Sequence, residues 1–335
     1  MILGLLGRRL LVALPILLLV SALLFGILRS LPVDPAAMSL PPNATLVEIE
    51  AKRVELGLTR PLPVQYAIWL RQLAEGRLGT SIQLRREVAG LVKTTLPATI
   101  ELALIAMAIA TVLGICGGLL LFASRRTPAE PLADLGSISL LSMPDFMWGL
   151  AFILLFGVAL EWLPFTGRLS PGFPRPDVTG FLLLDALVAG RPGTFRDALA
   201  HMVLPCSALG IAFSPAIMRV LRSSLLDVYQ EDYIAQARLR GVPERRILVR
   251  HALKNAILPT LALMGVQFGF LFGGTLLVEV IFSYPGIGNL MVDAVRNADL
   301  PVIQAVGLTY AVAVLVIATI VDGLYLVLNP KLAAR

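Results

Sequence analysis

Charged residues are scarce in this chain of 335 residues: Asp, Glu, Lys and Arg together make up 15% of it, whereas 57% of it is hydrophobic. A typical soluble domain carries roughly 25% charged residues. The mean hydropathy of +0.83 therefore argues against an ordinary soluble protein. Because the apolar residues are gathered into long blocks, they indicate membrane spans rather than one large soluble core.

Residues and motifs that carry catalysis or bind metals are also few. The two histidines, His201 and His251, fall at opposite predicted faces of the membrane, so they cannot share a metal ion or a catalytic triad. Cys116 and Cys206 lie inside apolar segments without a CxxC spacing, which is typical of packed thiols. Since GxxxxGK[ST], GxSxG, HExxH and dinucleotide fingerprints are all absent, we expect no enzymatic activity, cofactor or metal site in this chain.

The net charge of +6 raises the question of nucleic acid as a partner. However, the Lys and Arg residues lie beside apolar segments and are not interleaved with aromatic residues. This distribution favours a role in membrane topology, so we expect a lipid membrane and no nucleic acid.

Six segments are long and apolar enough to cross a hydrocarbon core of roughly 30 Å. They are Leu10–Leu28, Leu102–Ala123, Leu135–Leu160, Met202–Met218, Ala256–Val278 and Val302–Val321. The first is interpreted as a span that also serves as signal and anchor, because it is long for a cleavable signal. The fourth is short and contains Pro205 and Pro215, so it spans only if it extends to about Leu199 and Leu221.

The distribution of basic residues predicts which ends of the spans are cytoplasmic. With an inner N-terminus, inner and outer segments each hold 14 Lys and Arg residues, but the inner segments are shorter. Their basic density is therefore about twice as high, and short loops near span ends carry most weight in the positive-inside rule. We expect both termini in the cytoplasm of a bacterial or archaeal cell, with the chain in its cytoplasmic (inner) membrane.

The first outer segment, Arg29–Thr95, contains two predicted helices. Thr45–Leu56 has helical spacing followed by a stop at Gly57, Gln65–Ala74 is a second short helix, and Gly76–Gly79 predicts a turn. The segment is either a small cap on the outer surface or a docking site for a receptor.

Two further outer loops have recognisable features. Within Glu161–His201, the ten residues Phe181–Gly190 are too few to span and are predicted to be interfacial or tucked against the helices. Within Phe282–Pro301, the sequence SYPGIG predicts a tight turn.

Three acidic residues lie at membrane depth and are candidates for the translocation path: Asp145, Glu279 and Asp322. Glu279 and Asp322 end their predicted spans, where interfacial carboxylates are the simpler interpretation. Asp145 is deeper, and the sequence leaves open whether it faces water or is packed among its apolar neighbours.

The stretch Ser223–Pro259 is highly charged between two spans, with ten charged residues from Asp227 to Lys254. One helix face is predicted from the spacing of Leu226, Tyr229, Tyr233 and Ala237. Gly241 then offers a left-handed helix end, Pro243 suits the start of a new helix, and Glu244–Ala256 continues into the next span. The alternative is a solvated loop that only sets topology.

Several segments together resemble one family. Gln236-Ala237 before Gly241, with Ile257-Leu258-Pro259 downstream, resembles the EAA loop of ABC importer permeases. The stretches 232–259 and 278–295 resemble the dipeptide/oligopeptide/nickel permeases in particular. The same is true of LPVDPA, LGLTRPLPVQY, GRLGTS, LPATIELAL and VDGLYLVLNPKL, in the family's order. The N-terminal span and long first outer loop are similar to the "B" permease of the family's pair.

Two departures from the family's pattern are visible. The glutamate that begins the EAA motif is replaced by Ala235, which excludes a salt bridge from that position. The outer loop Pro164–Ala200 is longer than in the shortest members, which leaves receptor and substrate open.

The resemblance implies an all-α membrane protein with six transmembrane helices of the type I ABC importer permease fold. Its expected parts are an N-terminal helix (1–30), an extracytoplasmic region (31–96) and a five-helix core (97–335) with the coupling loop at 223–259. Implied partners are a second permease, two ATPase subunits that bind ATP and Mg, and an extracytoplasmic binding protein. Expected contacts to an ATPase subunit are Asp232, Tyr233, Ala237, Gly241, Val242 and Arg245.

The resemblance implies an importer of peptides or related solutes such as nickel chelates. A stand-alone channel or ion-coupled carrier and a purely structural scaffold are the alternatives from other classes. The channel leaves the structured basic loop without its cytosolic partner, and neither alternative accounts for the matched segments.

Overall fold

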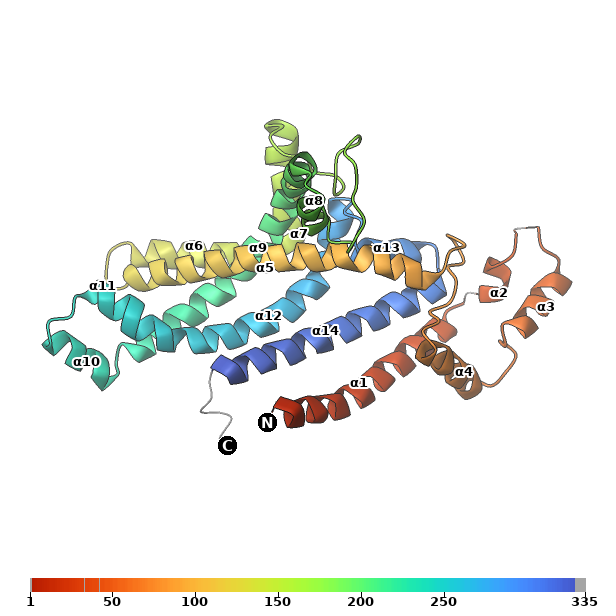
Figure 1. The fold of residues 1–335 in the computed structure, drawn as a ribbon, viewed down its shortest axis with the longest axis horizontal. Coiled ribbons are helices and arrows are strands. Elements are labelled where there is room, and N and C mark those ends of the chain that lie inside the picture. The colour runs from red at the N-terminus through yellow and green to blue at the C-terminus, as the bar shows by residue number, and fades with distance from the viewer. Residues whose placement is uncertain (1, 33, 42, 329–335) are drawn as a thin grey trace. The chain divides into compact units, whose positions relative to one another are not determined.

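The computed structural model describes residues 2–32, 34–41 and 43–328, and these residues are almost entirely helical or in turns (Figure 1). In this part of the chain, five helices are long and apolar enough to cross a membrane, or six if one bent pair forms a single span. The five are α1 (Ile2–Ser30), α5 (Val88–Ala123), α9 (Pro192–Val228), α12 (Leu253–Ile281) and α14 (Leu300–Leu328). The all-α membrane architecture predicted from the apolar blocks is confirmed.

The chain forms two compact units. Unit 1 comprises Met1–Ala98 and Pro285–Leu315, and unit 2 comprises Thr99–Tyr284 and Val316–Arg335. Helices α5 and α14 contribute residues to both.

Unit 1 contains the two helices predicted for the first outer segment, α3 (Leu46–Glu55) and α4 (Leu62–Ala74), and before them a short helix, α2 (Pro35–Met38), that was not predicted. Helix α3 begins with a capping box, in which Thr45 Oγ1 accepts from the Glu48 amide at 3.3 Å and the Thr45 amide donates to Glu48 Oε2 at 2.7 Å. Helix α4 starts three residues earlier than predicted. Gly57, Gly76 and Gly79 all have positive φ, so the predicted stop and turn are confirmed.

The core of unit 1 gathers apolar residues from α1, α5, α13 (Ile287–Arg296) and α14, among them Leu28, Val92 and Val306. The buried Asp299 carboxylate fixes the loop before α5, since its oxygens accept from the Ile82 and Gln83 amides at 3.2 and 3.1 Å.

The predicted span Leu135–Leu160 is not one straight helix. Helix α6 (Glu130–Ser142) ends at Met143, and α7 (Asp145–Phe152) with the π-helical η1 (Ile153–Ala159) leaves at an angle of 94°. Pro144 lacks an amide proton and disfavours helical geometry at the residue before it, and Met143 is accordingly extended with ψ of 126°. This segment is a broken span or a re-entrant loop.

Helix α9 is the central element of unit 2. It runs through Pro205 and Pro215 without ending, so the predicted extension of the fourth span is confirmed. Glycines of α5 allow α9 to pack closely: a Cβ on Gly114 would lie 2.5 Å from the Ile217 side chain. Cys206 is buried in α9, whereas Cys116 is exposed on α5, so the expectation of a packed thiol is wrong there.

The predicted local features of the two further loops are also present. Phe181–Gly190 contains the short helix α8 (Leu182–Val188), which packs against α9. The SYPGIG turn follows the end of α12, with Ser283 at φ of 48°.

Candidate functional site

The basic stretch between α9 and α12 folds as a helix, a turn and a helix at one end of unit 2 (Figure 1). Helix α10 (Asp232–Leu239) is followed by α11 (Glu244–Arg246), the π-helical η2 (Ile247–Ala252) and α12. The 38 residues from Glu244 to Ile281 form one helical stretch that is long and apolar enough to cross a membrane. Helix α10 is therefore joined to a membrane helix by a turn of only a few residues, and a movement of α10 would be passed to that helix.

The end of α10 is a Schellman motif. Gly241 has φ of +74°, its amide donates to the Arg238 carbonyl at 2.9 Å, and the Val242 amide donates to the Ala237 carbonyl at 3.2 Å. A Cβ on Gly241 would meet nothing within 4 Å, so the requirement for glycine is set by backbone conformation and not by crowding. Pro243 lies just before α11 as its N-cap residue.

The predicted single helix face through Leu226, Tyr229, Tyr233 and Ala237 is wrong, because α9 ends at Val228 and α10 begins at Asp232. The three intervening residues turn the chain, and Glu231 is extended with ψ of 144°. The turn brings Ile234 into a buried apolar cluster. We call this cluster the loop core; its fully or nearly fully buried members are Phe122, Leu221, Leu225, Ile234, Ile247, Ala252 and Ala256.

The six predicted contact residues divide between two environments. Ala237 and Val242 are half-buried and pack against the loop core, so they shape the loop from its inner side. The other four, Asp232, Tyr233, Gly241 and Arg245, are exposed. Leu239 was not singled out from the sequence, yet at 89% exposure it is the most exposed large apolar residue of this loop.

Two arginines enclose the ring of Tyr229. The Arg125 guanidinium carbon lies 3.5 Å from the Phe122 ring centroid and 4.9 Å from that of Tyr229, and Arg238 lies 5.3 Å from the latter. Burial and the Glu244 carboxylate raise the pKa of Tyr229 above its ordinary value, although both arginines oppose the shift. The phenol is therefore neutral at physiological pH and remains a cation–π acceptor. This stack ties the end of α5 to the start of the loop.

The three acidic candidates lie in three different settings. Asp145 is the first residue of α7 after the 94° break, is half-buried, and accepts the Phe146 amide at 2.7 Å. Its Oδ2 would lie 3.1 Å from a Cβ on Gly274 of α12, so the absence of a side chain there makes room for the carboxylate.

Glu279 lies in the last turn of α12, at the end of its span as predicted, and is fully buried within the protein. Its Oε1 accepts from Thr99 Oγ1 of α5 at 2.6 Å. A hydroxyl donor satisfies part of the carboxylate's hydrogen-bonding capacity inside the unit.

Asp322 is half-buried near the end of α14. Its neighbour Val321 packs on Gly265 of α12, nine residues from Gly274, which is roughly 13 Å along a helix. The structure thus does not bring Asp322 next to Asp145. In the described part of the chain, no group of three or more metal-ligating side chains is found.

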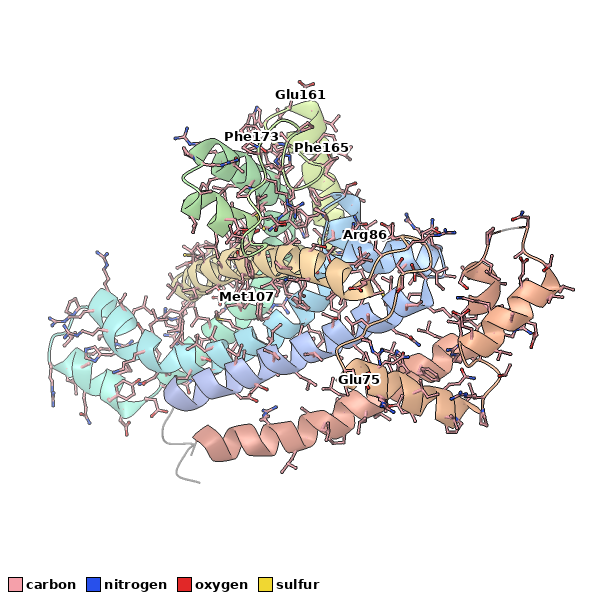
Figure 2. The ribbon with its side chains drawn as sticks, turned by 45° about the vertical axis from the view of Figure 1, so that its right-hand side comes forward. Glu75, Arg86, Met107, Glu161, Phe165 and Phe173 are labelled. Atoms are coloured by element: carbon pink, nitrogen blue, oxygen red, sulfur yellow. The ribbon has the colours of Figure 1, made fainter. Side chains whose placement is uncertain are left out.

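A buried ion pair that was not predicted from the sequence joins the loop after η1 to α5. Arg168, 4% exposed, donates to Glu101 of α5 and to the Gly180 carbonyl, and the Leu183 amide donates to Glu101 Oε1 at 2.9 Å. Figure 2 shows this loop, on which Phe165 and Phe173 are labelled, folded beside α5 and α9. Glu101 lies one residue before the predicted second span, which was the available signal for a buried charge.

Comparison with known proteins adds a family match over most of the chain. A family model described as "Binding-protein-dependent transport system inner membrane component" matches residues 110–334. A second, described as the N-terminal part of such a membrane component, matches residues 2–103.

The chain is 37% identical to the di/tripeptide transport system permease protein DppB of Pseudomonas aeruginosa over 331 residues, which is 98% of each protein. It is 36% identical to the dipeptide permease DppB of Escherichia coli K12 (97% of each) and 35% identical to the glutathione permease GsiC of Pectobacterium atrosepticum (97% of each).

Among solved structures, an inward-facing MetNI methionine ABC transporter matches with a TM-score of 0.55 and 14% identity. The match covers 71% of this chain and 96% of the matched chain, and it shows a shared fold.

Proposed function

Because this chain belongs to the family of binding-protein-dependent transport system inner membrane components, we propose that it is a permease subunit of an ATP-driven peptide importer. The near-full-length similarity to di/tripeptide and dipeptide permeases supports peptides as the substrate class. A stand-alone channel or ion-coupled carrier is not favoured, since it leaves the structured cytosolic loop without a partner.

The subunit has no ATP site of its own in this proposal. Two ATPase subunits would bind ATP and Mg, a second permease would complete the pathway, and an extracytoplasmic binding protein would deliver the peptide. The chain is a multi-pass membrane protein, and the density of Lys and Arg near span ends supports cytoplasmic termini. Nickel chelates and other small solutes remain alternative substrates for this chain, because the resemblance to the dipeptide/oligopeptide/nickel permeases includes them.

One observation carries the mechanism: α10 is attached to the membrane helices at both ends. At its start, Tyr229 packs on Phe122 of α5 with ring centroids 4.6 Å apart. At its end, the Gly241 turn leads into the helix that continues to Ile281. An ATPase that moves α10 would therefore tilt α9 and α12 together, and the pathway would alternate between inward and outward access.

The π-helical η2 lies where this motion enters the membrane helix. A π-helical turn within an α-helix is a frequent feature of functional sites. We assign to it the local adjustment that lets α12 tilt while α11 stays with the loop.

Among the acids, Asp145 is the strongest candidate for contact with a passing substrate. It is half-buried at a break in the helix, whereas Glu279 is fully buried and bonded to Thr99. If Asp145 attracts cationic peptides, then Asp145→Asn should lower the uptake of Lys- and Arg-containing dipeptides more than that of neutral ones. Equal uptake of both classes would remove Asp145 from the pathway.

The assembly is tested by gentle detergent extraction of the tagged chain from its host. The expected result is a second permease and ATPase subunits with vanadate-sensitive ATP hydrolysis, together with uptake of dipeptides by the reconstituted complex. Recovery of a single chain under the mildest extraction, with transport that needs no ATP, would support a channel or carrier instead.

The role of the loop is tested by Gly241→Trp, which we expect to leave the protein inserted while uptake is lost. The matched control is Gly190→Trp, because Gly190 also has positive φ (63°) and open space around it but follows α8 on the outer loop. Normal uptake by Gly241→Trp would contradict the proposed contact.

A further inference from the structure

Unit 1 contains a cavity of about 770 Å³ that the transport mechanism above does not use. Its walls come from the last turn of α1, the end of α3 with the turn that follows, α4, the loop of residues 77–85, and the first turn of α14. In Figures 1 and 2, α4 lies beside the end of α1, with Glu75 labelled just beyond α4.

The lining of this cavity is strongly basic. Five cationic side chains line it against a single acidic one, Glu55; the five are Arg29, Lys52, Arg60, Arg77 and Arg85. Lys52 pairs with Glu55 at 2.7 Å, and Arg77 pairs with Glu75. In the described part of the chain, no carboxylate forms an ion pair with Arg29, Arg60 or Arg85. Three guanidinium groups are thus available to an anion from outside the protein.

Among the lining residues, Arg29 is the strongest indication that the cavity can bind an anion. It lies in the last turn of α1, its Nε is buried without a hydrogen-bond partner, and its guanidinium carbon lies 5.3 Å from the Phe25 ring centroid. A buried donor of a charged group without an acceptor is unfavourable, and an anion in the cavity would supply the acceptor.

The other side of the cavity is apolar, which narrows the class of anion. Leu28, Phe25, Ile68 and Trp69 line it, and the rings of Phe25 and Trp69 lie 5.5 Å apart. Residues Leu11–Ser30 form a membrane span candidate, so the cavity opens where that span ends. Aromatic residues at the end of a span mark the boundary between hydrocarbon and headgroups. A ligand that is anionic at one end and apolar at the other fits both sides.

We propose that this cavity binds the phosphate-bearing headgroup of an anionic membrane phospholipid. Guanidinium groups match phosphate oxygens with two parallel hydrogen bonds, and basic pockets beside membrane helices are suited to lipid headgroups. The lipid is favoured over a free anion because the cavity joins its cationic wall to an apolar one at membrane level. The bound lipid would hold α3 and α4 against the end of α1.

The test is native mass spectrometry of the complete chain, with the subunits that purify with it, after exchange into detergent containing phosphatidylglycerol or phosphatidylcholine. We expect phosphatidylglycerol to remain bound and phosphatidylcholine to be lost. A basic residue near a lipid headgroup contributes about 1 kcal/mol, roughly fivefold in affinity, so Arg29→Gln with Arg60→Gln should weaken phosphatidylglycerol binding by about 25-fold.

The matched control replaces Arg71 and Arg86 by Gln, because it removes the same charge from this unit without touching the cavity lining. The control should bind like the unaltered protein, and Arg29→Lys with Arg60→Lys should bind with intermediate affinity, because lysine keeps the charge but cannot form the two parallel hydrogen bonds of a guanidinium. The lysine variant also reports on the proposal if the glutamine variant fails to fold.

Four results would overturn the proposal. The first is equal phosphatidylglycerol binding by the glutamine variant and its control. The second is retention of both lipids alike. The third is displacement of phosphatidylglycerol by millimolar inorganic phosphate, which would assign the cavity to a soluble anion. An acidic segment of a partner protein that cross-links into the cavity in place of lipid would also contradict it.

Discussion

Replacing Ile234 by Ala should release α10 from the membrane helices without altering the surface that α10 presents to an ATPase. Ile234 is fully buried, and it is the one buried residue of this eight-residue helix. Isolated helices shorter than about 12 residues are marginal in water, so α10 depends on this packing to stay folded.

The size of the effect follows from the burial. An Ile-to-Ala change in a core costs about 2–5 kcal/mol, and an Ile-to-Val change about 0.5–1.5 kcal/mol. The loop core joins α10 to α5, α9 and η2. The lost free energy therefore weakens the docking of α10 and does not destabilise the membrane spans. A loss of 2 kcal/mol corresponds to a roughly 30-fold larger population of undocked α10.

Hydrogen–deuterium exchange of the purified complex measures this population directly. Amides of residues 232–242 should exchange about 30-fold faster or more in Ile234→Ala, less so in Ile234→Val, with α9 unchanged. The matched control is Leu239→Ala on the exposed side of the same helix, which should leave exchange unaltered in the isolated chain and weaken ATPase binding. Equal exchange in Ile234→Ala and the unaltered protein would refute the inward anchoring of α10.

Three further predictions concern single interactions. Gly241→Ala should destabilise the loop by about 1–2 kcal/mol in thermal unfolding, because alanine is strained at positive φ, and Gly241→Asn should cost less; equal stability of all three would contradict the Schellman motif. Breaking the buried pair by Glu101→Gln or Arg168→Met should lower stability by about 3–5 kcal/mol, and the double change should recover part of it; purely additive losses in a double-mutant cycle would refute the pairing. Since the folded-state pKa of Tyr229 is raised, the stability of the loop should be constant below the ordinary tyrosine pKa and fall as pH rises through the raised one; Tyr229→Phe should abolish this fall, and a fall that persists in Tyr229→Phe would assign it to another group.

Local chemistry allowed much of the fold to be predicted from the sequence. The stop at Gly57, the turn at Gly241 and the helix that continues from Glu244 each depend on residues within a few positions of one another. The apolar blocks predicted the membrane spans for the same reason, because a span depends only on a run of consecutive apolar residues that is long enough to cross the bilayer.

The break within Leu135–Leu160 was not predicted, because hydropathy averages over the segment and is insensitive to geometry. Pro144 was the available signal for the break. The face predicted through Tyr229 and Tyr233 was wrong because helical spacing continues by chance across a three-residue turn.

The sequence by itself determined the class of protein, the order of its helices and the chemistry of its turns, and its motifs resembled the family that the comparisons then showed. Only the tertiary structure decided which charges are buried and with what partners. Thr99 and Glu279 are 180 positions apart, and Glu101 and Arg168 are 67 apart. Turn and helix signals act over one or two turns of chain, whereas a buried charge depends on whichever distant helix packs against it.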